Sequence, residues 1–169
     1  GYIARNLICL LQKEKPEIEL ELYDLAERHV DGAEHYHCVN MLEEELERKI
    51  DFSCDLIYMF AGKTGSVNGF DQYEAFLDTN ERALLNVLNA YRKSHSEAKL
   101  IFPSTRLVYK GKEGALQEDA EKEFKTIYAI NKFACEQYLK QYQNVFGVKY
   151  CTFRICLPYG TLIPNATSY

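Results

Sequence analysis

Short apolar runs alternate with longer amphipathic segments along almost the whole chain. Strands are predicted at 18–24, 35–39, 54–60, 99–104 and 149–155, and helices at 1–15, 41–50, 73–94 and 127–146. The runs CDLIYMF and KLIFPS are apolar almost throughout, which is typical of strands covered on both faces. Strict alternation of strand and helix predicts βαβ units, and therefore a doubly wound parallel α/β sheet in three αβα layers.

Length and charge exclude several classes of protein. The chain has 169 residues, a formal net charge of -5 and a pI near 5.4. Such an acidic balance argues against a general nucleic-acid binder, which needs lysines and arginines to neutralise phosphates. The sequence has neither an apolar run long enough to span a bilayer nor the features of a secretion signal. We therefore expect a single cytoplasmic domain without membrane contact.

Cysteines and histidines do not form a recognisable metal motif. The six cysteines include no C-x-x-C pair, and most lie in apolar runs, so we expect free cysteines that pack as small buried hydrophobes. His35 and His37 share one face of a predicted strand, but no further ligand stands at suitable spacing. We predict that the chain holds no metal.

In doubly wound sheets, ligands bind where the strands end, at their carboxyl edge. Gly1-x-x-Ala4 opens the first helix, whose free N–H groups would favour a pyrophosphate. Asp24 ends the next strand 23 positions after Gly1, about where an acidic residue binds the ribose of NAD. Asp24 could equally be a helix cap or a solvated loop carboxylate. Arg28 could meet a 2′-phosphate or simply be an exposed helical arginine.

The most informative spacing is Tyr128-x-x-x-Lys132. On a helix it places the phenol and the ammonium one turn apart on the same face, where the cation favours the phenolate. Such a tyrosine could donate and accept a proton near neutral pH. Upstream, a buried strand runs into Ser104 and Thr105, whose hydroxyls could bind a substrate alcohol or ketone, or merely cap a turn. Their order along the chain favours a catalytic set.

These residues resemble the extended short-chain dehydrogenase/reductase family, in particular its nucleotide-sugar epimerase branch. The matching segments are GYIARNL, CDLIYMFAG, DTNERALLNVLNA, PSTRLVYKG, YAINKFACE and FRICLPYG. The resemblance covers nearly the whole chain and implies a Rossmann-like domain that binds NAD, with NADP less favoured. It implies cofactor contacts from Gly1, Tyr2, Ile3, Asp24, Ala61, Gly62, Asn80, Lys132 and Pro158.

The same resemblance assigns the catalytic positions. Tyr128 and Lys132 take the places of the family's tyrosine and lysine, Thr105 that of the catalytic hydroxyl, and Ser104 that of a neighbouring supporting group. Asn80 matches an asparagine that supports the lysine through water.

The chain departs from the family pattern at several places. The first strand and first glycine would precede Gly1, and the smaller substrate domain would follow Tyr169, so we expect residues 1–169 to be a portion of a longer protein. Leu157 stands where an asparagine usually touches the nucleotide-sugar. Arg106 and Leu107 replace the Asp-Glu pair of sugar dehydratases, which argues against that activity. Lys110 replaces a glycine, and the sequence offers no function for it.

The resemblance implies an NAD-dependent epimerase of a nucleotide-sugar, working through a transient keto intermediate with Tyr128 as acid and base. Two alternatives remain open: a reductase or dehydrogenase of the same family that uses NAD or NADP, and a nucleotide-binding module without catalysis. A homodimer through helices 73–94 and 127–146 is also implied. Both helices carry apolar residues on more than one face, although these could instead cover the sheet and each other: Leu85, Leu88, Tyr91, Phe133, Tyr138 and Tyr142.

Overall fold

In the described residues, five strands form the framework and pair in parallel within two sheets. The computed structural model describes residues 1–27, 35–65, 67–160 and 162. Strands β1 (Glu21–Asp24) and β2 (His35–Cys38) pair in one sheet, and β3 (Leu56–Tyr58), β4 (Lys99–Thr105) and β5 (Tyr150–Ile155) pair in another. All three pairings are parallel, as the alternating sequence pattern predicts. The fold is Rossmann-like, with helices flanking parallel strands.

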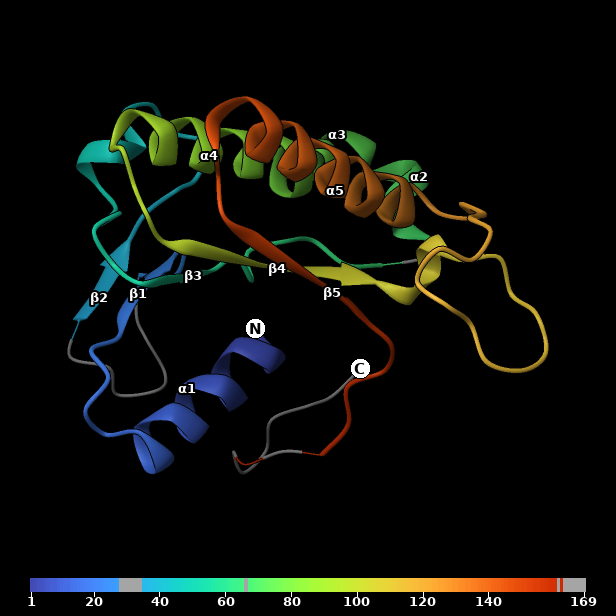
Figure 1. Cartoon of the computed structure of the whole chain (residues 1–169), viewed down its shortest axis with the longest axis horizontal. Coiled ribbons are helices and arrows are strands. Elements are labelled where there is room, and N and C mark those ends of the chain that lie inside the picture. Colours follow the sequence, from blue (N-terminus) through green and yellow to red (C-terminus); the bar gives the residue numbers. More distant parts are fainter. Residues whose placement is uncertain (28–34, 66, 161, 163–169) are drawn as a thin grey trace.

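Helices lie on both sides of these strands. They are α1 (Tyr2–Glu14), α2 (Asn68–Asp71), α3 (Tyr73–Phe76), α4 (Ala83–Lys93) and α5 (Ile127–Phe146). Figure 1 shows α3, α4 and α5 along one face of β3–β5, and α1 on the opposite side. The predicted helix 73–94 is present, but a π-helical turn at Leu77–Arg82 joins α3 to α4.

Local chemistry sets the ends of α5, the longest of these helices. The Thr126 hydroxyl oxygen accepts a hydrogen bond from the Ala129 N–H and caps the first turn. The helix ends at Gly147, whose φ of 72° is left-handed, and the Gly147 N–H returns to the Gln143 carbonyl. Glycine adopts this conformation without a steric penalty, so the chain leaves the helix here.

The core lies between α4, α5 and the three-stranded sheet. Leu84 and Leu88 of α4 and Leu139 of α5 are fully buried against Leu100 and Phe102 of β4. The inward residues of α4 recur at three- and four-residue steps, which is why the sequence predicted this helix well. This packing fixes α5 against β4, the two elements that carry the candidate catalytic residues.

The prediction of a helix at 41–50 is wrong. The segment is reduced to a 3₁₀ turn, η1, at Leu46–Arg48. Asn40 caps the start of this segment, because its side-chain oxygen accepts a hydrogen bond from the Leu42 N–H, and Glu45 adopts a left-handed φ of 55°. The segment is rich in glutamates, whose mutual repulsion also disfavours a continuous helix.

The prediction of buried cysteines holds for Cys135 alone. All six cysteines are free, but Cys38 and Cys156 are exposed, and the other three are half-buried. Cys38 ends β2 and Cys156 directly follows β5, so both are exposed although apolar residues adjoin them in the sequence. No described helix has the length and apolarity that a membrane crossing requires.

Candidate active site

The carboxyl ends of the strands carry most of the predicted site residues. Asp24 ends β1, Ala61 and Gly62 follow β3, Ser104 and Thr105 end β4, and Pro158 follows β5. Tyr128 and Lys132 lie in the first turns of α5, which packs against β4 and against the turn η3 (Arg106–Val108). The structure therefore gathers the residues of the three-stranded sheet and α5 at one edge. Asp24 lies in the separate two-stranded sheet.

Lys132 is a buried cation at this edge. The residue is only 5% exposed, with Nζ 4.6 Å from the centroid of the Phe102 ring and 5.8 Å from that of Tyr128. Within the described part of the chain, no carboxylate or carbonyl oxygen pairs with this ammonium. Because burial disfavours the charged form, the pKa of Lys132 falls to about 8. A ligand that offers oxygen acceptors would relieve this cost.

Asn80 shapes the loop beneath Lys132. Its Oδ1 accepts from the Lys63 N–H at 2.9 Å, and its Nδ2 donates to the Lys63 carbonyl at 3.0 Å. Asn80 is buried in the π-helical turn, a type of turn often found at functional sites. The side-chain amide thus supports the loop directly.

Gly62 lets the loop backbone approach Asn80 and the Lys132 ammonium closely. A Cβ added here would lie 3.1 Å from Asn80 Oδ1 and 3.6 Å from Lys132 Nζ. The missing side chain leaves a small cradle between loop, asparagine and lysine. Together with the buried ammonium, this cradle fits the ribose hydroxyls of a dinucleotide.

The two hydroxyls at the end of β4 have different environments. Ser104 is buried and donates its hydroxyl proton to Glu136 of α5. Thr105 Oγ1 accepts a hydrogen bond from the Leu107 N–H at 3.2 Å and caps the turn η3. Thr105 therefore caps a turn, as the sequence allowed, and this cap uses its hydroxyl oxygen only as an acceptor. The Thr105 proton can still be donated to a substrate oxygen.

Glu136 and Arg154 were not singled out from the sequence. Arg154 Nε and a terminal nitrogen donate to the two oxygens of Glu136 at 2.9 and 2.6 Å. Glu136 follows Lys132 by four residues, so continuation of the Tyr128–Lys132 stripe was the signal that could have identified it. Lys110, which had no assigned role, forms an ion pair with Glu121 at 3.0 Å.

The predicted dinucleotide contacts are only partly described by the structure. α1 starts at Tyr2 with Gly1 as its N-cap, and no side chain among the described residues caps its first turn. Tyr2 and Ile3 are half-buried. Asp24 is exposed, and its Oδ1 accepts from the Ala26 N–H at 3.3 Å. Arg28 lies outside the described residues.

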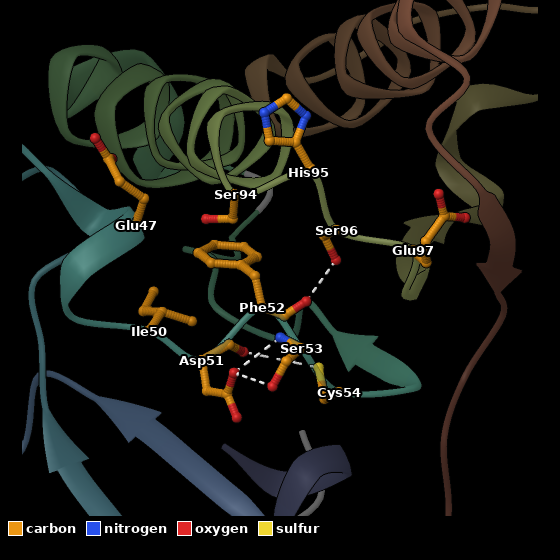
Figure 2. Close-up of a pocket in the computed structure, with 10 residues that line it drawn as sticks. All are labelled: Glu47, Ile50, Asp51, Phe52, Ser53, Cys54, Ser94, His95, Ser96 and Glu97. Atoms are coloured by element: carbon orange, nitrogen blue, oxygen red, sulfur yellow. Dashed lines mark hydrogen bonds between the residues drawn. The ribbon is translucent and has the colours of Figure 1, made fainter.

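A separate hollow lies at the amino ends of β3 and β4 (Figure 2). It is lined by the segments 47–54 and 94–97, and Ser96 closes one side by donating to the Phe52 carbonyl at 2.7 Å. None of the predicted site residues lines it. It is therefore distinct from the edge that carries Lys132.

Parallel βαβ units with a tyrosine one helical turn from a buried lysine are typical of a dinucleotide-binding domain. Comparison with known proteins gives the family. The model of the NAD dependent epimerase/dehydratase family matches residues 1–168. The chain belongs to this family, which confirms the resemblance noted in the sequence.

Curated relatives include two sugar-nucleotide epimerases. CDP-paratose 2-epimerase of Salmonella typhi is 25% identical over 123 residues, which are 63% of this chain and 36% of the relative. UDP-glucose 4-epimerase of Mycoplasma pneumoniae is 28% identical over 116 residues, with 64% and 34% covered. The match thus spans about a third of the length of either relative.

Solved structures agree on the fold. UDP-glucose 4-epimerase from Brucella ovis, in complex with NAD, has a TM-score of 0.85 at 18% identity, over 95% of this chain and 50% of that one. The UDP-glucose 4-epimerase of Thermus thermophilus, also with NAD, has a TM-score of 0.79 at 25% identity, over 91% and 51%. The chain spans about half the length of these structures.

Proposed function

We propose that this chain is the cofactor-binding part of an NAD-dependent epimerase that acts on a nucleotide-sugar. The observation that carries the proposal is the pair of Tyr128 and Lys132 on one face of α5, with the ammonium buried and free of anionic partners in the described structure. The relatives are two to three times longer than the matched region, so we assign sugar recognition mainly to residues outside 1–169.

Each site residue has a distinct role in the proposed reaction. Tyr128 takes the proton of a sugar hydroxyl and later returns it. A bound NAD would supply the hydride acceptor and donor. Thr105 donates a hydrogen bond to the same sugar oxygen, which becomes a keto oxygen in the intermediate. The protonated Lys132 binds the ribose hydroxyls of the cofactor and stabilises the Tyr128 phenolate. Asn80 and Gly62 keep the ribose site open.

Asp24 sets the proposed preference for NAD over NADP. Its carboxylate is exposed at the end of β1 and can accept hydrogen bonds from both ribose hydroxyls. The same charge would repel the 2′-phosphate of NADP. The pyrophosphate would bind at the N-terminus of α1, near Gly1, Tyr2 and Ile3.

We further propose a homodimer and a cytoplasmic location. The helical face of α3, the π turn and α5 exposes apolar side chains, among them Tyr73, Leu77 and Ile130. Leu88 and Tyr91, which the sequence offered as contacts, are buried against the sheet and cannot contribute. The cytoplasm is supported by six free cysteines, two of them exposed, which suit a reducing compartment.

An epimerase assay tests the proposal directly. The protein is purified without added cofactor, its NAD content is measured, and UDP-glucose is converted in the absence of free NAD or NADH. Appearance of the 4-epimer by NMR supports the epimerase. Net oxidation of UDP-glucose that consumes added NAD or NADP indicates the dehydrogenase or reductase alternative instead, and binding without any turnover indicates a nucleotide-binding module.

A further inference from the structure

The proposed reaction leaves one buried ion pair unexplained. Glu136 is 8% exposed, and both of its carboxylate oxygens accept hydrogen bonds from Arg154 in a two-pronged contact. Oε1 also accepts from the Ser104 hydroxyl. Desolvation of two charges is costly, and this geometry offsets it with several charge-assisted hydrogen bonds. The hydrogen bonds to Glu136 raise the pKa of Arg154 above its ordinary value, so the arginine stays charged.

Arg154 extends the contact to a fourth segment of the chain. Its other terminal nitrogen donates to the Tyr109 hydroxyl at 2.6 Å and to the Glu118 carbonyl at 2.8 Å. Arg154 also stands opposite Ser104 in the register between β4 and β5. A single arginine thus joins β5, α5, the end of β4 and the segment 109–123.

The segment 109–123 connects the two catalytic hydroxyls. The segment begins just after Thr105 and the turn η3, and it ends shortly before Tyr128. Its two arms are paired near their base, where the Lys110 N–H donates to the Glu121 carbonyl and the Glu123 N–H donates to the Val108 carbonyl. When this base is held in place, the positions of both Thr105 and Tyr128 are constrained.

Glu136 continues the catalytic stripe of α5. Tyr128, Lys132 and Glu136 are spaced four residues apart, so they lie on one face of the helix. The contact of Glu136 with Ser104 therefore fixes how far α5 lies along the end of β4, one residue from Thr105. A shift or rotation of α5 would break it.

We propose that Glu136 and Arg154 form a positioning clamp, which acts through Ser104 and the segment 109–123 to hold Thr105 and Tyr128 in mutual register. The proposal rests on the function assigned above. Neither residue touches the reacting atoms. Ser104, on this view, serves the reaction through Glu136.

Glu136→Gln tests the clamp, because the amide keeps the size of the side chain but turns an N–H₂ group toward the donors of Arg154. We expect kcat to fall at least roughly tenfold, while the KM for the sugar nucleotide and the Kd of NAD change less than about threefold. A purely structural role would lower NAD binding and activity together. Unchanged kcat would overturn the proposal.

Glu81→Gln is the matched control. The Glu81 carboxylate also accepts from two α5 side chains, Asn131 and Tyr138, but no described hydrogen bond joins it to β4 or to the segment 109–123. A comparable loss of stability with kcat within about threefold of wild type is expected. Equal losses of kcat in both variants would mean that general loosening of α5 explains the effect.

A double-mutant cycle separates the two possible roles of Ser104. If Ser104 acts through Glu136, the variant with Ser104→Ala and Glu136→Gln loses no more kcat than the worse single variant. If the two losses multiply, Ser104 acts on the substrate independently, which contradicts its part in the clamp.

Hydrogen exchange keeps the test independent of the assigned reaction. In Glu136→Gln, amides at the base of the segment, Lys110 and Glu123, are expected to exchange at least roughly tenfold faster, whereas Glu81→Gln leaves them unchanged. Absence of epimerase turnover in the wild type would refute the proposed function alone. Unaltered exchange in Glu136→Gln would refute the clamp.

Discussion

The ammonium nitrogen of Lys132 lies 5.8 Å from the centroid of the Tyr128 ring, one helical turn away on α5. A cation this close to the ring would favour the phenolate form of Tyr128. The proposed function assigns proton exchange to this tyrosine and cofactor binding to this ammonium.

Tyr128→Phe keeps the ring but removes the proton that is transferred. We expect turnover to fall by roughly 100-fold or more, the usual scale for loss of a general acid–base group, with little change in NAD affinity or melting temperature. Steady-state epimerisation and NAD titration measure the two effects. Wild-type turnover in this variant would show that Tyr128 is only a packing residue.

Lys132 makes stability depend on pH in the alkaline range. Its folded-state pKa of about 8 lies below the usual 10.5 of an unfolded lysine, so between these values the unfolded chain keeps a proton that the folded chain has released. The free energy of unfolding should therefore rise with pH across this window, by roughly 3 kcal/mol in total. Urea unfolding of the cofactor-free protein, with Lys132→Met as the reference, measures the difference. Parallel pH profiles for the two proteins would contradict the prediction.

Asp24→Asn tests cofactor choice. Loss of the charge removes both the attraction for ribose hydroxyls and the repulsion of a 2′-phosphate, so the preference for NAD over NADP should fall by roughly tenfold or more. Titration with both cofactors gives the ratio. Asp55→Asn, an exposed carboxylate at the amino end of β3, is the control and should leave the ratio unchanged. Tighter binding of NADP than of NAD by the wild type would show that a cation near the 2′-phosphate, and not Asp24, determines the cofactor preference.

Strong local patterns made most of the fold predictable. The apolar runs of β3 and β4 and the periodic inward face of α4 correctly gave parallel strands covered by helices. The prediction of a helix at 41–50 failed because a left-handed Glu45 interrupts the segment. Such backbone choices depend on tertiary packing that a local pattern does not contain.

Motif spacing predicted which elements carry the candidate residues better than it predicted their contacts. The hydroxyls at the end of β4 and the Tyr128–Lys132 pair lie where the sequence predicted. The partner of Ser104 was not predictable, because Glu136 is 32 positions further on and meets it only when α5 packs on β4. Arg154 likewise reaches Tyr109 across 45 positions. Long-range side-chain pairing requires the fold.

The proposed dimer depends on the exposed helical face. Introducing charges there with Leu77→Glu and Ile130→Glu should weaken association by roughly 100-fold, because each carboxylate would be buried without a partner. Analytical ultracentrifugation at micromolar concentration measures the mass. Leu10→Glu on α1 is the control, since Leu10 and Leu77 are both 43% exposed. A monomeric wild-type protein would dispose of the dimer.

Gly62→Ala probes the cradle between Asn80 and Lys132. The new methyl group would lie 3.1 Å from Asn80 Oδ1, so the amide must move by a few tenths of an ångström and loosen its hold on the Lys63 backbone. The methyl group would also occupy space beside the Lys132 ammonium, where the cofactor ribose is proposed to bind. We expect the Kd of NAD to rise by roughly tenfold, measured by calorimetry.

Gly111→Ala is the matched control for this change. An added Cβ at Gly111 meets no atom within 4 Å, so the alanine is accommodated without movement. Here the smaller conformational freedom of the unfolded chain should raise stability by about 0.4–1 kcal/mol, with NAD affinity unchanged. If Gly62→Ala likewise leaves NAD affinity at the wild-type value, the space beside Lys132 is not where the cofactor binds.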